Sequence, residues 1–202
     1  MTYLIGITGG IGGGKSTITY YLSETGATII DTDRISHEVT LPGSDALDEI
    51  RTVFGPSVFH EDGSLDRKAM AGVVFGDEEK LSLLNSILHP RIRKRWLKVA
   101  GECKEPFAFV AIPLLFENNL QRYFDEIWVV TADEDERIKR VMARDNASRE
   151  SVQRRMAHQI PESEKIDAAD IVIDTSGGYE TTRASTLKAL ADLKRRLGLE
   201  VA

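Results

Sequence analysis

The sequence has a single cysteine, Cys103, among its 202 residues, which excludes an intrachain disulfide and a cysteine-based metal framework. No apolar run approaches the roughly 20 residues of a membrane-spanning helix, and the first residues form no basic, signal-like segment. The formal net charge of -6 disfavours general binding to nucleic acid or membrane surfaces. We therefore expect a soluble, unprocessed cytoplasmic protein without nucleic-acid or membrane partners.

Short apolar segments recur along the chain between helical patterns. They predict five strands, at residues 3–8, 27–31, 107–112, 126–131 and 170–175. These segments are apolar almost throughout, which is typical of parallel strands covered by helices on both faces. The sequence therefore predicts an α/β fold of three layers around a five-stranded parallel sheet.

Two intervals depart from a simple alternation of strand and helix. Only helical patterns and turns separate the second strand from the third, so we expect a helical insertion there. Its last helix has apolar residues at Leu81, Leu84, Ile87 and Leu88. We expect Asp77 to cap this helix and Pro90 to kink or interrupt it. Between the fourth and fifth strands we expect two charged helices, the second capped by Ser148.

The stretch "GITGGIGGGKST" carries the clearest chemical signal. Gly9, Gly14, Lys15 and Ser16 match G-x-x-x-x-G-K-[ST], with a predicted strand before and an amphipathic helix after. Glycines let successive backbone N–H groups point inward, and the helix N-terminus adds positive potential, so the loop forms an anion cradle. In such a loop Lys15 reaches the β- and γ-phosphates and the Ser16 hydroxyl coordinates Mg²⁺.

A phosphate-binding loop of this kind also occurs in switches and partitioning ATPases. A guanine-nucleotide switch requires an Asn-Lys-x-Asp element, whereas the nearest string here is "EKID", with Glu164 in place of the asparagine. A partitioning ATPase carries a second lysine early in the loop, where this chain has Gly10. A small-molecule kinase remains, with a nucleotide-binding protein that lacks turnover as the alternative.

Further motifs narrow the kinase class. The strings "IIDTDRISHEV", "PGSDAL", "DGSLDR", "ILHPRIR", "IPLLFE", "ERIKRVMARD", "RMAHQ" and "ADIVID" follow the glycine-rich loop in an order that resembles the dephospho-CoA kinase family nearly end to end. The resemblance implies transfer of the γ-phosphoryl group of ATP to the ribose 3'-hydroxyl of dephospho-CoA, which gives coenzyme A and ADP.

The resemblance also implies a domain organisation. A P-loop kinase core would comprise residues 1–39, 103–132 and 168–202. Residues 40–102 would form the helical domain for the CoA-like substrate, and residues 133–167 a mobile lid. We expect ATP and Mg²⁺ as cofactors, and a monomer or weak homo-oligomer.

The expected site residues fall into four groups. The catalytic group is Asp33, Lys15 and Arg140. The nucleotide-binding group is Gly10, Ile11, Gly12, Gly13, Gly14, Lys15, Ser16, Thr17 and Arg144. The substrate-binding group is Thr8, Asp33, Arg67, His89, Arg93, Leu114 and Phe116, and the metal-binding group is Ser16 and Asp33. The resemblance assigns Asp33 to the acceptor hydroxyl, and the two arginines at 140 and 144 to lid closure on the ATP phosphates.

Several of these residues have structural alternatives. Asp33 precedes a helical stretch and is a candidate cap. Arg140 and Arg144 share one helical face with Glu136, which is also typical of a solvated ion-pair face. His89 has the alternative of a helix-end histidine with satisfied hydrogen bonds, and Arg67 has the same status. Leucine and phenylalanine side chains at 114–116 are also typical of core.

Three positions leave a role open. The strand at 107–112 ends without the Walker-B aspartate usual in P-loop enzymes, because Ala111 stands there. Asp33 or Asp31 is the first choice for the replacement acid, with Glu117 next. The family commonly has Asn where this chain has Thr175 and Arg where it has His37, so base recognition and the role of His37 are open.

Overall fold

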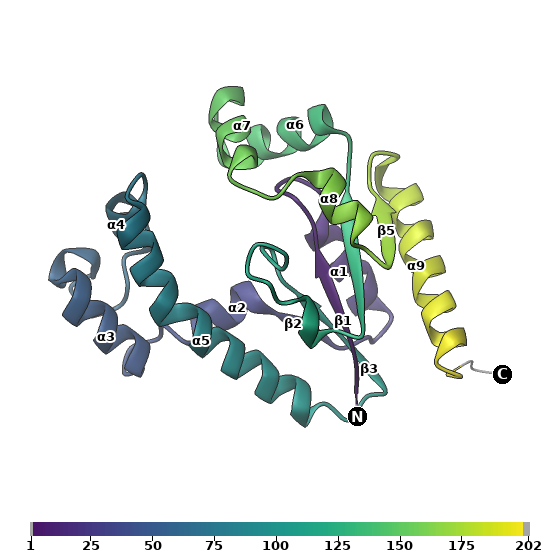
Figure 1. Cartoon of the computed structure of the whole chain (residues 1–202), viewed down its shortest axis with the longest axis horizontal. Helices are drawn as coiled ribbons and strands as arrows, with labels where there is room; N and C mark the ends of the chain where they lie inside the picture. The colour runs from purple at the N-terminus through teal and green to yellow at the C-terminus, as the bar shows by residue number, and fades with distance from the viewer. Residues whose placement is uncertain (1, 200–202) are drawn as a thin grey trace. The chain divides into compact units, whose positions relative to one another are not determined.

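The computed structural model describes residues 2–199. Its centre is a five-stranded sheet in the order β2-β3-β1-β4-β5 (Figure 1). The strands are β1 Tyr3–Thr8, β2 Ile29–Asp31, β3 Phe107–Ala111, β4 Glu126–Thr131 and β5 Ile171–Asp174. All five predicted strands are present, and β1 and β4 have the predicted bounds. The other three are shorter than predicted by one to two residues at one or both ends.

The register of the sheet brings the functional loops to one edge. β1 runs parallel to β3 and β4, with Ile7 opposite Ala111 and also opposite Trp128. β5 runs parallel to β4. Because carboxyl ends of parallel strands meet at the same edge, the loops after β1, β3, β4 and β5 leave the sheet together.

The chain divides into two compact units, one running to Ile30 and resuming from Cys103, the other spanning Asp31–Glu102. The first unit contains the helices α1 Lys15–Glu24, α6 Glu134–Asp145, α7 Arg149–Ala157, α8 Glu162–Asp167 and α9 Gly178–Arg196, with a short 3-10 turn at Gln121–Tyr123. Ile18 and Leu22 of α1 and Leu190 and Leu193 of α9 are buried in one cluster with strand residues. This cluster covers one face of the sheet and fixes the start of α1 at the end of β1.

The segment between β4 and β5 contains three helices, where the sequence predicted two. α6 and α7 lie beside each other beyond the carboxyl ends of β1 and β4 (Figure 1). The Ser148 hydroxyl accepts from the Ser151 N–H at the start of α7, as predicted. The six-residue α8 was missed, because a polar helix of under two turns has no measurable apolar period.

The second unit is helical, as predicted for the insertion. It contains α2 Thr32–Glu38, α3 Asp45–Phe54, the 3-10 turn Pro56–Val58, α4 Arg67–Val74 and α5 Glu78–Glu102. Its core is formed by Ala46, Ile50, Val58, Met70, Leu84 and Ile87. Asp77 accepts from the Lys80 N–H, which confirms the predicted cap of α5.

Pro90 does not interrupt α5. The helix is continuous over all 25 residues from Glu78 to Glu102, with Pro90 inside. A proline removes one N–H from the helix ladder and crowds the preceding turn. Here the Arg91 side chain donates through Nη1 to the Ile87 carbonyl at 2.8 Å, which supplies an additional donor beside the proline. Leu84 and Ile87 are buried as predicted, whereas Leu81 is 44% exposed.

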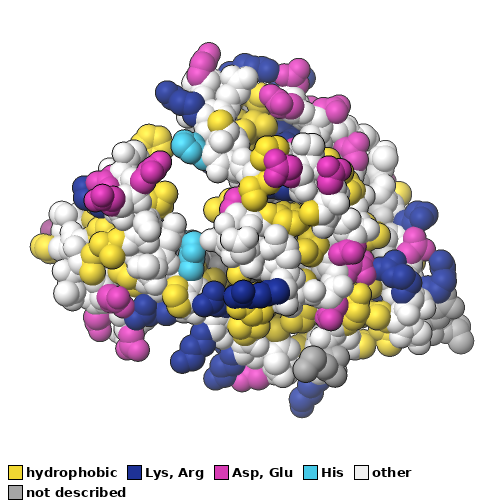
Figure 2. Space-filling view, viewed as in Figure 1, with side chains coloured by type: hydrophobic (Ala, Val, Ile, Leu, Met, Phe, Trp, Pro, Cys, Tyr) yellow, Lys and Arg dark blue, Asp and Glu magenta, His cyan; other side chains and the backbone are white. Residues whose placement is uncertain are grey.

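Within the described residues, no helix is both long and apolar enough to cross a membrane. On the face drawn in Figure 2, basic and acidic side chains both lie over the region of α6 and α7. This region therefore presents mixed charge, in keeping with its charged sequence.

Candidate active site

The glycine-rich loop connects the end of β1 to the start of α1. The Gly13 N–H donates to the Gly10 carbonyl at 3.0 Å, which closes a turn within the loop. α1 begins at Lys15, after Gly14, and has no acidic residue in its first turn. The positive end of the helix dipole therefore lies beside the loop, and no acidic side chain of the helix's own first turn offsets it, which suits an anion.

Gly12 shows why the loop needs bare backbone. Its φ is 78°, in the left-handed region, and a Cβ there would lie 2.5 Å from the carbonyl oxygen of Arg137. A side chain at this position would therefore clash with the backbone of α6. Close packing against α6 therefore requires the glycine.

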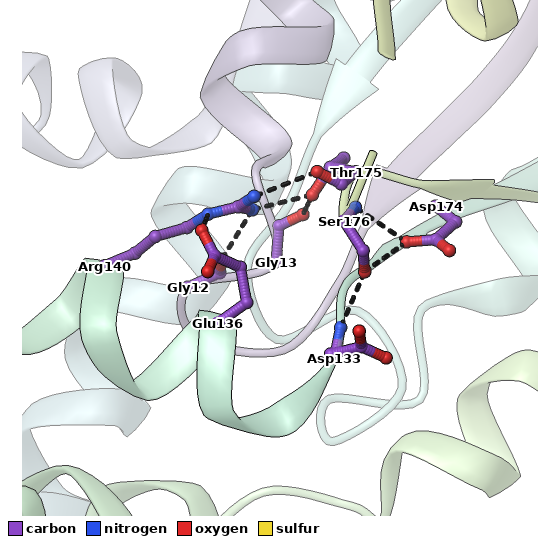
Figure 3. A network of polar contacts seen from close by, with 8 residues as sticks. All are labelled: Gly12, Gly13, Asp133, Glu136, Arg140, Asp174, Thr175 and Ser176. Atoms are coloured by element: carbon purple, nitrogen blue, oxygen red, sulfur yellow. Dashed lines mark hydrogen bonds and ion pairs between the residues drawn. The ribbon is translucent and has the colours of Figure 1, made fainter. Parts of the chain in front are cut away.

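Arg140 lies against this loop. Its Nη1 donates to the Thr175 hydroxyl at 2.7 Å and to the Gly12 carbonyl at 3.4 Å, and its Nη2 donates to the Thr175 carbonyl at 2.9 Å (Figure 3). The Thr175 hydroxyl in turn donates to the Gly13 carbonyl at 3.0 Å. Nε pairs with Glu136 Oε1 at 3.2 Å. The structure therefore joins α6, the glycine-rich loop and the loop after β5 through one guanidinium.

The end of β5 is tied to the start of α6 by a short polar chain. Asp174 accepts from the N–H and the hydroxyl of Ser176, and the Ser176 hydroxyl oxygen accepts from the Asp133 N–H at 2.9 Å (Figure 3). The hydrogen bonds from Ser176 lower the pKa of Asp174 below its ordinary value. An ionised Asp174 thus holds the loop that carries Thr175.

Arg144 has different partners from Arg140. Its Nε and Nη2 donate to Asp145, at 2.6 Å and 3.0 Å, and Asp145 also accepts from Arg155 at 2.6 Å. These hydrogen bonds raise the pKa of Arg144 and hold the pKa of Asp145 far below its usual range. The hydrogen bonds described for Arg144 therefore place it in an ion-pair cluster of α6 and α7, while Arg140 contacts the loop.

The loop after β3 carries several predicted substrate residues. Leu114 is 40% exposed, whereas Phe116 is 5% exposed and belongs to the buried part of the molecule. Thr8 is fully buried, and its hydroxyl donates to the Pro113 carbonyl at 3.4 Å. Thr8 therefore connects the end of β1 to the loop after β3 by a hydrogen bond.

Glu117 and Ala111 bear on the question of the missing acid. Ala111 ends β3 and is 1% exposed. Glu117 Oε1 pairs with the fully buried Lys165 Nζ at 2.7 Å and accepts from the Ile160 N–H at 3.2 Å. Oε1 of Glu117 is therefore engaged by a lysine and a backbone donor, whereas Oε2 is buried without a hydrogen-bond partner among the described residues.

The second unit contains the remaining predicted residues. Asp31 Oδ1 accepts from the N–H groups of Asp33 and Arg34, at 2.8 Å and 3.3 Å, and so caps α2. Asp33 is exposed in the first turn of the same helix. Arg67 donates to the Thr40 hydroxyl at 2.7 Å and to the Ser36 carbonyl at 3.3 Å.

His89 and Arg93 lie one turn apart on α5. Desolvation, and then the positive charge of Arg93, lower the pKa of His89 below its ordinary value. The lowered pKa favours the neutral form of the exposed imidazole, which lies beside a half-buried guanidinium.

Arg137 and Gln159 are contacts of the loop that the sequence did not single out. Arg137 donates through Nε to the Ile11 carbonyl, and Gln159 accepts from the Ile11 N–H. The sequence did contain a sign that Arg137 is buried. It lies four residues before the buried Val141 and therefore on the apolar side of α6. Gln159 follows α7 outside any helix, where no periodicity applies.

The fold and this loop define a class of protein. A parallel sheet with the observed strand order, whose first strand runs through G-x-x-x-x-G-K-S into a helix, is a P-loop kinase fold. A profile of the dephospho-CoA kinase family matches residues 3–181. The chain belongs to the dephospho-CoA kinase family.

Individual relatives agree with this membership. The chain is 43% identical to a dephospho-CoA kinase of Carboxydothermus hydrogenoformans over 194 residues, which cover 95% of this chain and 94% of the other. A crystal structure from Thermus thermophilus superposes with a TM-score of 0.84 at 34% identity, covering 95% of this chain and 97% of that one. A dephospho-CoA kinase from Campylobacter jejuni gives a TM-score of 0.65 at 26% identity, with the same coverage.

Proposed function

We propose that the protein transfers the γ-phosphoryl group of ATP to the ribose 3'-hydroxyl of dephospho-CoA and releases coenzyme A and ADP. The observation that carries this proposal is the glycine-rich loop between β1 and α1, with Arg140 held against its backbone. Membership of the dephospho-CoA kinase family supports the choice of acceptor.

The nucleotide phosphates bind to the loop at residues 10–14 and to the first turn of α1. Lys15 neutralises the β- and γ-phosphates as a point charge, while backbone N–H groups, including those of Ser16 and Thr17, donate hydrogen bonds to phosphate oxygens. Phosphoryl transfer proceeds through a loose transition state, so this positioning and charge neutralisation supply most of the catalysis. Arg140 adds a cation on the same side.

Asp33 binds the acceptor hydroxyl. Its carboxylate orients the ribose 3'-hydroxyl for in-line attack and accepts the proton as the new O–P bond forms. Support for this role comes from the position of Asp33 in an exposed first turn of α2, whose cap is provided by Asp31. The alternative that Asp33 is only a helix cap loses its main ground, because Asp31 caps α2.

The residues present fit a magnesium ion shared with the nucleotide. Mg²⁺ bound to ATP takes one or two protein oxygens and several phosphate and water oxygens. The Ser16 hydroxyl of the first unit and the Asp33 carboxylate of the second are each oxygen groups that would hold it. Among the described residues no three acidic, histidine or cysteine side chains are grouped to hold a metal by themselves. When bound, the ion would offset the negative charge of the phosphates.

Residues of the second unit bind the CoA-like substrate. Arg93 is a cation suited to the substrate's phosphates, and the neutral His89 beside it adds hydrogen-bonding capacity without repelling Arg93. Arg67 is anchored by Thr40 and completes the basic set. Leu114, Phe116 and Thr8 shape the substrate side of the first unit. We assign residues 40–102 to this substrate domain and residues 133–167, with Arg140 and Arg144, to a lid.

The acceptor test compares substrates directly. ADP release should be measured with dephospho-CoA, nucleosides, shikimate and no acceptor, at saturating Mg²⁺-ATP. We expect release that depends on dephospho-CoA and is abolished by Lys15→Ala, with an unchanged thermal melting curve. ATP binding without acceptor-dependent ADP release would instead favour the alternative of a binding protein, and near-normal turnover of folded Lys15→Ala would remove the loop assignment.

A kinetic comparison tests the substrate domain. Arg93→Ala should raise the KM for dephospho-CoA more than the KM for ATP, because its cation serves the acceptor's phosphates. A rise in the ATP KM alone would move Arg93 to the nucleotide side. We further propose that the enzyme works in the cytoplasm as a monomer or weak homo-oligomer, which size-exclusion chromatography with light scattering would check.

A further inference from the structure

Ile11 lies at the apex of the glycine-rich loop, and both of its backbone polar groups are bound by side chains from outside the loop. Its N–H donates to Gln159 Oε1 at 2.9 Å. Its carbonyl accepts from Arg137 Nε at 3.1 Å. Arg137 belongs to α6 and Gln159 follows α7. Two separate parts of the segment between β4 and β5 therefore form hydrogen bonds with one residue of the loop.

Arg137 is well suited to hold a fixed position. It is 5% exposed, and its Nη1 pairs with Glu162 Oε2 of α8 at 3.0 Å. A buried guanidinium is costly unless it is paired and hydrogen-bonded, so these contacts lock its place. Gly10 permits the approach, because a Cβ there would lie 2.2 Å from Arg137 Nη2 and 2.5 Å from Glu162 Oε2.

The backbone next to Gln159 is anchored by a second buried ion pair. The residue that follows it, Ile160, donates its N–H to Glu117 Oε1, which also pairs with Lys165 Nζ at 2.7 Å. Lys165 is fully buried in α8. The side-chain oxygen of Gln159 is thus aimed at Ile11 by a backbone that is itself anchored.

We infer that Gln159 and Arg137 are positioning residues that hold the apex of the loop in its phosphate-binding shape through Ile11. The inference rests on the proposed phosphate-binding role of the loop. Neither side chain needs to touch the nucleotide. Each acts by removing freedom from a glycine-rich segment that would otherwise sample many conformations before binding.

A positioning role predicts selectivity among nucleotides. The loop receives the β- and γ-phosphates, so its distortion should weaken ligands that carry a β-phosphate and leave AMP nearly unaffected. A merely structural role of Gln159 would instead weaken all nucleotides together with the fold. ADP and AMP are therefore the two probes.

The experiment compares Gln159→Leu with Gln153→Leu, which makes the same change at an exposed position of α7. Isothermal titration calorimetry should show the Kd of ADP raised roughly tenfold in Gln159→Leu, since a partner of a half-buried N–H is lost, with AMP changed less than about twofold. Steady-state kinetics should show a higher KM for ATP and an unchanged KM for dephospho-CoA. Gln153→Leu should match wild type in every measurement.

Arg137→Lys provides a second variant if Gln159→Leu folds poorly. Lysine keeps a charge for Glu162 but lacks the planar fork that reaches Glu162 and Ile11 at once, so the same selective loss of ADP binding is expected. Wild-type affinity for ADP in both variants, or equal weakening of ADP and AMP, overturns the inference. A wild-type protein that binds ADP no better than AMP would overturn the phosphate role of the loop, and the inference with it.

Discussion

The guanidinium of Arg140 and the backbone and hydroxyl of Thr175 form a paired contact, with Nη1 to Oγ1 at 2.7 Å and Nη2 to the carbonyl at 2.9 Å. Thr175 stands where the family commonly has asparagine. In this chain its hydroxyl both accepts from Arg140 and donates to the Gly13 carbonyl. Thr175 therefore connects a proposed lid cation to the nucleotide loop through the loop's own backbone.

Arg140→Ala should lower kcat more than it lowers ATP affinity. A cation that stabilises charge developing in the transition state is worth about 10²-fold or more in kcat, whereas ground-state binding retains Lys15 and the loop. Stopped-flow or steady-state kinetics with calorimetric ATP binding would separate the two quantities. Arg144→Ala is the matched comparison and should be milder, because Arg144 pairs with Asp145. Wild-type kinetics in both variants would favour the solvated ion-pair interpretation of α6.

Gly10→Ala should destabilise the protein by about 1–3 kcal/mol, the usual range for overpacking a tight site. The added methyl group would meet Arg137 and Glu162, whose ion pair has little room to move. Gly72→Ala is the control, since Gly72 lies in α4 and a Cβ there meets nothing within 4 Å. It should stabilise by up to about 1 kcal/mol through helix propensity. Urea unfolding of both variants gives the comparison, and equal stability of Gly10→Ala and wild type would contradict the close contact.

Local sequence signals were sufficient for most of the fold. Continuous apolar segments identified all five strands, and capping side chains identified the starts of α5 and α7. Pro90 was expected to kink or interrupt the helix. The interruption does not occur, because propensity describes an isolated helix and α5 is held by burial of Leu84, Ile87 and Trp96. Tertiary packing can outweigh the loss of one helix hydrogen bond.

The glycine-rich loop could also be predicted from the sequence, since the spacing of its residues and the flanking elements specify how it works. The side-chain contacts that hold the loop could not be predicted. Arg137, Gln159 and Glu162 act through long-range pairs, separated from the loop by more than a hundred positions in the chain. A charged residue in a charged helix has the pattern of a surface residue, and only the packing of α6 shows that Arg137 is buried. The loop's multiple glycines were likewise interpreted from anion binding alone, without the packing against α6.

Stability should depend on pH through His89. Desolvation of the imidazole, and then the charge of Arg93, lower its folded-state pKa below that of the unfolded chain, although the residue is exposed. The unfolded state therefore binds more protons once the pH falls below the unfolded pKa, and the folded state loses relative stability as the pH falls further. His89→Gln should remove this loss. Denaturation at pH 8 gives the baseline difference in the free energy of unfolding between wild type and His89→Gln. Between pH 7 and pH 5 that difference should change in favour of His89→Gln. A constant difference would contradict the lowered pKa.

Asp33→Asn provides the test of the proposed catalytic base, with Asp31 as its structural counterpart. Asparagine keeps the size and one acceptor oxygen but removes the charge, so it cannot take the proton of the acceptor hydroxyl. General-base assistance contributes about 10²- to 10⁴-fold, and a loose transition state demands little early proton removal. We therefore expect kcat to fall by roughly 10²-fold, with dephospho-CoA affinity changed only a few-fold.

The counterpart Asp31→Ala should show the reverse pattern. It removes the acceptor for the Asp33 and Arg34 N–H groups, so stability should fall by about 1 kcal/mol while kcat falls less than in Asp33→Asn. If the activity of Asp33→Asn also depends on Mg²⁺ concentration very differently from that of wild type, Asp33 has a second role. It then replaces the Walker-B acid that is missing at Ala111. A folded Asp33→Asn protein that retains more than about a third of wild-type kcat would exclude the base role, because a charge needed for proton removal cannot be lost without slowing that step.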